Sequence, residues 1–343
     1  MKAAVLYETN RPLVIETLKI PEPDFGQVLV KVHFSGICHK QMEEIRGHRG
    51  LDPYLPHLLG HEGAGVVETI GPGVTIVAPG DHVVLSWIKG VGIDANTPTY
   101  YKGEQPINAG WVTTFNEYAV VSENRVTGIR KDMPLDKAAL LGCAVATGVG
   151  VAINQARVIP GSTVAVFGIG GVGLNVVQGS ALASAGKIIA VDIVDAKLEM
   201  ATKFGATHTI NALKQNPVQQ IIELTGNIGV DYAFATIGKI ETMEQAYESA
   251  QKHGGYVNIV GVPPYGGKIS IDAYPLHDGK CLVGASGGQT RKEKDFPKYI
   301  ELYFAGKLKL DEQITHRYRL DDINMAFQLM EKGELGRAIV ELG

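Results

Sequence analysis

Short hydrophobic segments separated by turn residues fill the first 125 residues of the chain. The segments are rich in β-branched residues, and tripeptides such as Pro21-Glu22-Pro23 and Gly71-Pro72-Gly73 interrupt them. The expected strands are residues 3–6, 13–15, 28–32, 65–69, 81–86 and 117–121. Short strands at this spacing predict an antiparallel barrel or sandwich.

The pattern changes near residue 150, where short apolar runs begin to alternate with runs of helix length. Expected strands at 163–167, 187–191, 207–210, 230–235 and 256–260 alternate with expected helices at 172–184, 196–204, 217–224 and 242–251. This order predicts a parallel, doubly wound sheet. After about residue 286 the tail has expected helices at 294–305 and 322–331 and a strand at 338–342. The tail is too short to fold alone, so we expect it to pack back onto the first domain.

Composition narrows the class of protein. The chain has 343 residues, which predicts two domains at roughly 100–200 residues each. Lys and Arg number 32 against 36 Asp and Glu, so the net charge of −4 excludes the basic excess of a nucleic-acid-binding protein. Hydrophobic residues at 45% and charged residues at 20% are ordinary for a globular protein.

The number of cysteines and the length of the apolar segments indicate where in the cell the protein is expected. The three cysteines are too few and too scattered for a disulfide framework, so we expect reduced thiols in the cytoplasm. Residues 1–10 hold no apolar core of signal-peptide length. The longest apolar run, 138–153, falls short of the roughly 18 residues of a spanning helix, so we expect no membrane association.

A glycine-rich fingerprint opens the first helix of the alternating region. The run Gly168-Ile169-Gly170-Gly171-Val172-Gly173 follows an expected strand, and Asp192 ends the next one. In such a motif the first glycine permits a tight turn, the second admits a pyrophosphate and the last lets the helix pack on the strand. Asp192 would accept the ribose hydroxyls of NAD and repel a 2′-phosphate, and no Arg stands at 193 or 194. The alternative is a glycine-rich turn without a ligand.

Cys38, His61, Glu62 and Cys143 form a candidate metal set. Two thiolates and one imidazole would give a catalytic zinc three ligands and leave one position open. His61 lies 23 residues after Cys38 and 82 residues before Cys143, which is not a spacing typical of zinc sites. The spacing alone therefore leaves an alternative open, in which the cysteines are small buried hydrophobic residues and His61 is a core histidine. Cys281 lies in an apolar strand without a neighbouring histidine, and we expect it to be structural only.

The sequence around these residues resembles one family along the whole chain. Gly36-Ile37-Cys38-His39, Gly60-His61-Glu62-Gly63-Ala64-Gly65, the run from Leu141 to Gly148 and the glycine fingerprint occur in this order. Together they closely resemble the zinc-dependent medium-chain alcohol dehydrogenases. The resemblance implies an α/β protein with a Rossmann domain, residues 147–286, inserted in a GroES-like β-barrel catalytic domain, residues 1–146 and 287–343.

The resemblance also implies roles for individual residues. Cys38, His61 and Cys143 would bind a catalytic zinc, with Glu62 as an occasional fourth ligand. Trp87 would wall the substrate pocket. The NAD contacts implied, besides the fingerprint glycines, are His39 and Arg337 at the pyrophosphate, Thr147 and Val172 behind the nicotinamide, Lys197 beside Asp192 at the ribose, and Val260, Gly261 and Val262 along the nicotinamide edge. The family pairs its cofactor domains, so we expect a homodimer or homotetramer.

The chain departs from the family in three places. Residues 88–105 contain no cysteine, so we expect no structural zinc, and Tyr100-Tyr101 would pack this lobe instead. Lys40 and Gln41 stand where a hydroxyl residue and an Asp are usual, and Glu43 replaces a relay histidine. We hypothesise that Lys40 accepts the substrate proton, relayed by Glu43 or water, or hydrogen-bonds an oxygen-rich substrate. A plain surface lysine is the alternative.

The expected reaction is hydride transfer between an alcohol and NAD, forming an aldehyde or ketone. Lys40 favours a polyol, a sugar derivative or a cyclitol over a simple alkanol. Two other classes stay open: a metal-free quinone or enone reductase on the same scaffold, and a non-catalytic dinucleotide-binding protein. The joint presence of Cys38, His61, Cys143 and Asp192 argues against the first of these.

Overall fold

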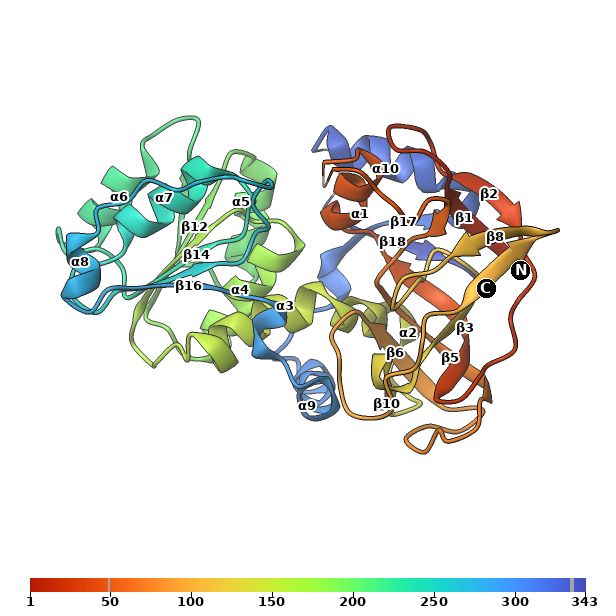
Figure 1. Ribbon diagram of the computed structural model, residues 1–343. Coiled ribbons are helices and arrows are strands. Elements are labelled where there is room, and N and C mark those ends of the chain that lie inside the picture. Colours follow the sequence, from red (N-terminus) through yellow and green to blue (C-terminus); the bar gives the residue numbers. More distant parts are fainter. Residues whose placement is uncertain (49, 334–335) are drawn as a thin grey trace. The chain divides into compact units, whose positions relative to one another are not determined.

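A computed structural model describes residues 1–48, 50–333 and 336–343. The chain forms two compact units (Figure 1). Unit 1 comprises Met1–Cys143 and Arg291–Gly343, and unit 2 comprises Ala144–Thr290. Each unit is described by itself.

One sheet of unit 1 joins both ends of the chain. Its strand order is β10-β6-β5-β3-β18-β17, and β9 also pairs with β3. The strands are β3 (Gln27–Gly36), β5 (Glu62–Ile70), β6 (His82–Ser86), β9 (Tyr118–Ser122), β10 (Val126–Ile129), β17 (Ile314–Arg319) and β18 (Arg337–Glu341). β18 runs antiparallel to β3 with Ile339 opposite Gly36. This pairing confirms that the C-terminal tail packs back onto the first part of the chain.

The second sheet of unit 1 contains a hairpin in the lobe that lacks cysteines. Its order is β2-β1-β4-β8-β7, and its strands are β1 (Lys2–Leu6), β2 (Val14–Thr17), β4 (His57–Leu58), β7 (Thr99–Lys102) and β8 (Gln105–Asn108). Tyr100 is fully buried, and its hydroxyl accepts the Val120 N–H at 2.8 Å. Tyr101 is exposed, because successive residues of a strand face opposite sides. Only the first of the two tyrosines therefore packs the lobe as predicted.

Glu123 ties separate loops of unit 1 to one carboxylate. The buried side chain accepts the backbone N–H groups of Thr75 at 2.6 Å, Ile76 at 3.0 Å and Ile93 at 2.7 Å. Burial alone raises the pKa of Glu123, but these backbone hydrogen bonds outweigh it and lower the pKa below its ordinary value. The ionised carboxylate thus orders the loops around the lobe.

The α-helices of unit 1 range from 4 to 13 residues. They are α1 (His39–Ile45), α2 (Leu135–Ala138), α9 (Lys292–Phe304) and α10 (Ile323–Glu331). Over the described residues, no single helix has the length and apolar content to cross a membrane, and only Leu135–Gly142 and Ala144–Gln155 taken together reach both.

Unit 2 is a parallel sheet in the order β13-β12-β11-β14-β15-β16. Its strands are β11 (Thr163–Phe167), β12 (Lys187–Asp192), β13 (His208–Asn211), β14 (Tyr232–Ala235), β15 (Tyr256–Ile259) and β16 (Cys281–Gly284), and its helices are α3 (Ala144–Gly150), α4 (Gly171–Leu182), α5 (Asp195–Lys203), α6 (Pro217–Leu224), α7 (Ile240–Ser249) and α8 (Tyr274–His277). Side chains of β11 alternate between two buried clusters: Val164 and Val166 pack with α4 and α5, and Ala165 and Phe167 pack with α6 and α7. Burial on both faces explains the continuous apolar runs and confirms the predicted doubly wound sheet.

Candidate metal centre and its cavity

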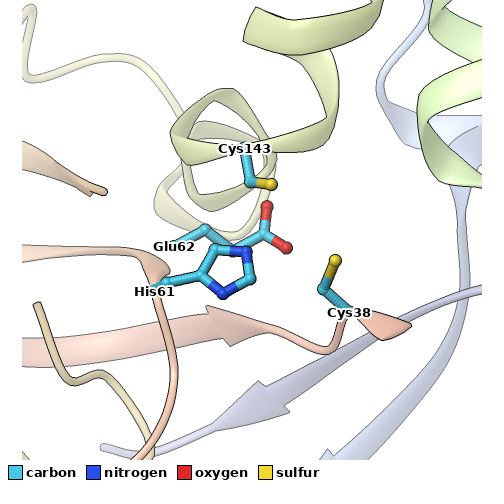
Figure 2. A group of neighbouring side chains, drawn as sticks. All are labelled: Cys38, His61, Glu62 and Cys143. Atoms are coloured by element: carbon cyan, nitrogen blue, oxygen red, sulfur yellow. The ribbon is translucent and has the colours of Figure 1, made fainter. Parts of the chain in front are cut away.

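Four side chains far apart in the sequence meet inside unit 1. Cys38 follows β3 and precedes α1, His61 and Glu62 stand at the start of β5, and Cys143 ends the first segment of the unit. One potential ligand atom from each residue lies within 4.8 Å of those of the others. Figure 2 shows the two sulfurs, the imidazole and the carboxylate directed toward one another. The structure therefore brings the predicted metal set together.

Glycines make room for this cluster. A Cβ at Gly36 would lie 2.6 Å from the carboxyl carbon of Glu62, and a Cβ at Gly142 would lie 2.5 Å from the Leu85 carbonyl oxygen. Real Cβ contacts are not this short, so both positions need glycine. The Gly-Ile-Cys and Gly-Cys sequences thus have a local steric reason, which is the approach of the backbone to the Glu62 side chain and to β6.

Three of the four donor side chains are buried, and Cys38 is half-buried. A hydrogen bond from the Cys143 thiol, with His61 and Arg337 nearby, holds the pKa of Cys38 well below its ordinary value. The same hydrogen bond, together with burial, raises the pKa of Cys143. Among the described residues, the buried His61 Nε2 and Glu62 Oε2 have no hydrogen-bond partner. Two sulfurs, an imidazole nitrogen and an unpartnered carboxylate oxygen fit zinc.

Arg337 lies behind the cluster. Its guanidinium pairs with Glu62 Oε1 and donates to the Ile37 carbonyl at 3.0 Å, and both charged side chains are buried. Burial raises the pKa of Glu62, and Arg337 partly offsets this. The pairing leaves the second oxygen of Glu62 free toward the cluster. The pyrophosphate contact implied for Arg337 stays a prediction, since here the guanidinium is bound inside unit 1.

Gln41 holds the histidine of the cluster. Its side-chain amide nitrogen contacts His61 Nδ1, and its Oε1 accepts the Cys38 backbone N–H at 3.2 Å. The sequence marked Gln41 only as a departure from the family. The signal that could have found its role was position, because a side chain three residues after a helix N-cap reaches back to the cap.

A cavity of about 730 Å³ reaches the cluster, within the size range of ligand pockets. Six of the residues that line it are His61, Gln41, Lys40, Glu44, Trp87 and Trp111. The predicted wall residue, Trp87, therefore does line a cavity beside the metal set, as does Lys40.

The carboxylate that partners Lys40 is Glu44. Lys40 Nζ donates to Glu44 Oε1 at 2.7 Å across one helical turn. The predicted relay residue, Glu43, is not among the described residues that line the cavity. Side chains three or four apart on a helix are neighbours on its surface, so helix spacing places both Glu43 and Glu44 within reach of Lys40. The i, i+4 spacing could therefore have marked Glu44 as a candidate beside Glu43.

Asp52 and His57 add a second polar pair to the cavity wall. Asp52 Oδ2 lies 2.9 Å from His57 Nε2, and the other carboxylate oxygen accepts the Tyr54 N–H at 2.9 Å. No pattern in the sequence marked either residue, because their pairing depends on the path of a loop.

In unit 2 the fingerprint glycines have three different environments. Gly168 has a φ of 92°, a Cβ at Gly173 would lie 1.8 Å from the Gly168 carbonyl oxygen, and a Cβ at Gly170 would have nothing within 4 Å. Asp192 ends β12, where its carboxylate accepts the N–H groups of Ile169 at 2.7 Å and Ile193 at 2.8 Å. Gly168 and Gly173 are therefore required by the fold, whereas Gly170 leaves open space above the backbone.

The remaining predicted cofactor residues lie at helix starts and strand ends. His39 begins α1, Thr147 lies in α3, Gly171 and Val172 begin α4, Lys197 lies in α5, and Val260, Gly261 and Val262 follow β15. Their roles stay predictions. Cys281 lies exposed on β16 and belongs to a different unit from the metal set.

The chain is similar to known dehydrogenases along its length. The family profile described as alcohol dehydrogenase GroES-like domain matches residues 24–131, and the profile described as zinc-binding dehydrogenase matches residues 171–305. Alcohol dehydrogenase class-3 of Dictyostelium discoideum is 37% identical over 373 residues, covering 99% of this chain and 97% of the relative. S-(hydroxymethyl)glutathione dehydrogenase of Paracoccus denitrificans is 37% identical over 373 residues, covering 99% of each.

Solved structures share the architecture. An alcohol dehydrogenase zinc-binding domain protein from Burkholderia ambifaria has a TM-score of 0.93 at 32% identity, covering 100% of this chain and 98% of that one. Benzyl alcohol dehydrogenase from Acinetobacter calcoaceticus has a TM-score of 0.91 at 32% identity, and the match covers 100% of this chain and 99% of that one. These likenesses confirm the predicted fold class, a GroES-like domain together with a Rossmann domain.

Proposed function

Since this chain belongs to the zinc-dependent medium-chain alcohol dehydrogenases, we propose that Cys38, His61 and Cys143 bind its catalytic zinc and that Glu62 is a weaker fourth ligand. The enzyme is an NAD-dependent oxidoreductase that acts on alcohols and carbonyls. The observation that carries the assignment is the convergence of four donor atoms within 4.8 Å, two of them buried without a partner.

Within this proposal each ligand has a distinct position. Zinc supplies Lewis acidity that lowers the pKa of an alcohol hydroxyl toward neutrality. The Cys38 and Cys143 thiolates and His61 Nε2 provide three strong donors. Arg337 neutralises Glu62 and binds one of its oxygens, which weakens that carboxylate as a ligand. A zinc ion held by these residues would be accessible to substrate from the cavity that His61 lines.

The substrate proton leaves through the Lys40–Glu44 pair. Lys40 Nζ lines the cavity and already donates to Glu44. Lys40 would first pass one of its ammonium protons to the Glu44 carboxylate. The neutral amine would then accept the substrate proton, and Glu44 would release its proton to solvent. In this proposal Glu44 has the relay role that the sequence predicted for Glu43 or water.

The substrate we propose is an oxygen-rich alcohol such as a polyol, a sugar derivative or a cyclitol. The supporting observations are the size of the cavity and its two polar pairs, Lys40–Glu44 and Asp52–His57, whose atoms can hydrogen-bond several hydroxyls. A simple alkanol has no additional hydroxyl groups with which to hydrogen-bond these two pairs.

The cofactor proposal is NAD bound to unit 2, with the pyrophosphate over Gly170 and the ribose hydroxyls on Asp192. The open space above Gly170 supports it, as does the absence of Arg at positions 193 and 194. We further propose no structural zinc, a cytoplasmic location and a homodimer or homotetramer that pairs through β16, the edge strand of the parallel sheet.

Metal analysis with matched cysteine variants tests the site. We expect about one zinc per chain in the parent and in Cys281→Ala, and almost none in Cys143→Ala, with NAD binding intact in all three. Loss of oxidation should follow loss of zinc. Activity without zinc would instead support a metal-free reductase, and NAD binding without zinc or turnover would support a binding protein.

A substrate panel with NAD, followed at the nicotinamide absorbance, tests the substrate class. It should compare cyclitols, polyols and sugar derivatives with simple alkanols, and include S-(hydroxymethyl)glutathione because of the Paracoccus relative. We expect Lys40→Met to reduce kcat and to change its pH dependence. Equal rates across unadorned alcohols, or an unchanged pH–rate profile, would contradict these assignments.

A further inference from the structure

One buried side chain, Gln41, touches two members of the metal set. Its Oε1 accepts the backbone N–H of Cys38, and its amide nitrogen contacts Nδ1 of His61. Gln41 is 1% exposed, so water does not replace either partner. The chemistry of this amide therefore acts directly on the histidine ring.

The first of these hydrogen bonds determines which end of the amide faces the histidine. A backbone N–H can only donate, so the carbonyl oxygen of Gln41 must face Cys38 and the NH2 group must face His61. An NH2 group also only donates, so Nδ1 has to accept. A neutral imidazole then carries its proton on Nε2. Nε2 is one of the two buried atoms of the metal set, with Glu62 Oε2, that lack a hydrogen-bond partner among the described residues.

Zinc requires the opposite tautomer. A metal at Nε2 uses the lone pair of that nitrogen, which moves the ring proton to Nδ1. The Nδ1–H would then face the NH2 group of Gln41, and two donors would meet. Turning the amide over removes this conflict but places the NH2 group against the N–H of Cys38. In either orientation one buried donor is left without an acceptor.

We propose that Gln41 is a positioning residue that holds His61 in the tautomer protonated on Nε2 and thereby weakens zinc binding at the site. The inference rests on the proposed zinc site. A carboxylate of the same length accepts both N–H groups at once and removes the conflict. This chain therefore retains its zinc less tightly than a variant with glutamate at position 41.

Zinc affinity measured by competition with a chromophoric chelator tests the proposal. We expect Gln41→Glu to bind zinc about ten- to a hundredfold more tightly than the parent, the range seen for groups that orient a metal-bound histidine. Lys40→Gln is the matched control, because it changes the charge near the site by the same amount without touching His61. An unchanged affinity in Gln41→Glu, or an equal gain in Lys40→Gln, would overturn the proposal.

The tautomer itself is measurable in the unmodified protein. In the metal-free parent, 15N-histidine NMR should show His61 protonated on Nε2, and the proton should move to Nδ1 when zinc is added. The signal is identified by its loss in His61→Asn. A metal-free ring protonated on Nδ1 overturns the proposal while leaving the zinc site intact. A parent that binds no zinc overturns the site as well.

Discussion

The buried ion pair between Glu62 and Arg337 allows a quantitative prediction. The Glu62 side chain is fully buried, and Arg337 is 7% exposed. Arg337→Met removes the cation and keeps most of the aliphatic volume. The metal-free protein then holds a buried carboxylate without a counterion, and the Ile37 carbonyl loses a donor.

Breaking one side of a buried pair costs about 3–5 kcal/mol, whereas a surface pair contributes about 0–1 kcal/mol. We therefore expect Arg337→Met to lower the free energy of unfolding by about 3–5 kcal/mol, and Arg337→Met with Glu62→Gln to lose less. Burial already raises the pKa of Glu62, and removal of Arg337 raises it further. A raised carboxyl pKa favours the folded state at low pH, and this contribution is lost as pH rises through that pKa. The loss in Arg337→Met should therefore be larger at about pH 8 than at about pH 5.

Tryptophan fluorescence during urea unfolding can isolate this effect. The only tryptophans of the chain, Trp87 and Trp111, both belong to unit 1, so their signal follows the unit that holds the pair. The midpoint and slope give the free energy for each variant. A loss below about 1 kcal/mol in Arg337→Met, or the same loss in the double variant, would refute the buried pair.

Three further predictions follow from other parts of the fold. Gly170→Ala should leave the melting temperature of unit 2 unchanged but weaken NAD binding, measured by calorimetry, about tenfold or more. Gly173→Ala should instead destabilise unit 2 by about 1–3 kcal/mol, because a Cβ at Gly173 meets backbone and a Cβ at Gly170 does not. The same effects in both variants would contradict the assigned roles. Burial lowers the pKa of Lys292 to about 7, so the folded state releases this proton before the unfolded chain does, and stability should rise from about pH 7 to about pH 10. In Lys292→Met the urea midpoint should no longer rise with pH over this range. A parent protein whose urea midpoint does not rise with pH would contradict the lowered pKa of Lys292. Glu123→Gln should lower the free energy of unfolding by about 1–3 kcal/mol, since three backbone N–H groups lose an ionised acceptor; an unchanged urea midpoint by tryptophan fluorescence would show that water replaces it.

Hydrophobic periodicity was sufficient wherever structure depends on near neighbours. Strand β11 and helix α6 begin and end at the predicted residues, because a strand buried on both faces and a helix with Pro at its start leave clear local marks. Strand β17 was not predicted. Its sequence is charged and mostly exposed, and only its pairing with β18 makes it a strand.

The metal set likewise combines features that the sequence predicted with features that depend on tertiary contacts. Cys38, His61 and Cys143 were predicted through family resemblance, since their spacing left a core interpretation open. Helix positions made contacts of Gln41 with the N-cap and of Lys40 with Glu44 possible, but the tertiary structure decided that Gln41 also faces His61, a residue on another element.

By itself the amino-acid order determined the alternation of strands and helices, the parallel sheet and the glycine turn, because each depends on which residues lie within a few positions along the chain. Tertiary structure decided which donors face His61, which carboxylate pairs with Arg337, and which strands border β3. The first two of these contacts join residues 20 and 275 positions apart. Their energies depend on burial and on the geometry of partners, and neither quantity is recorded in local sequence.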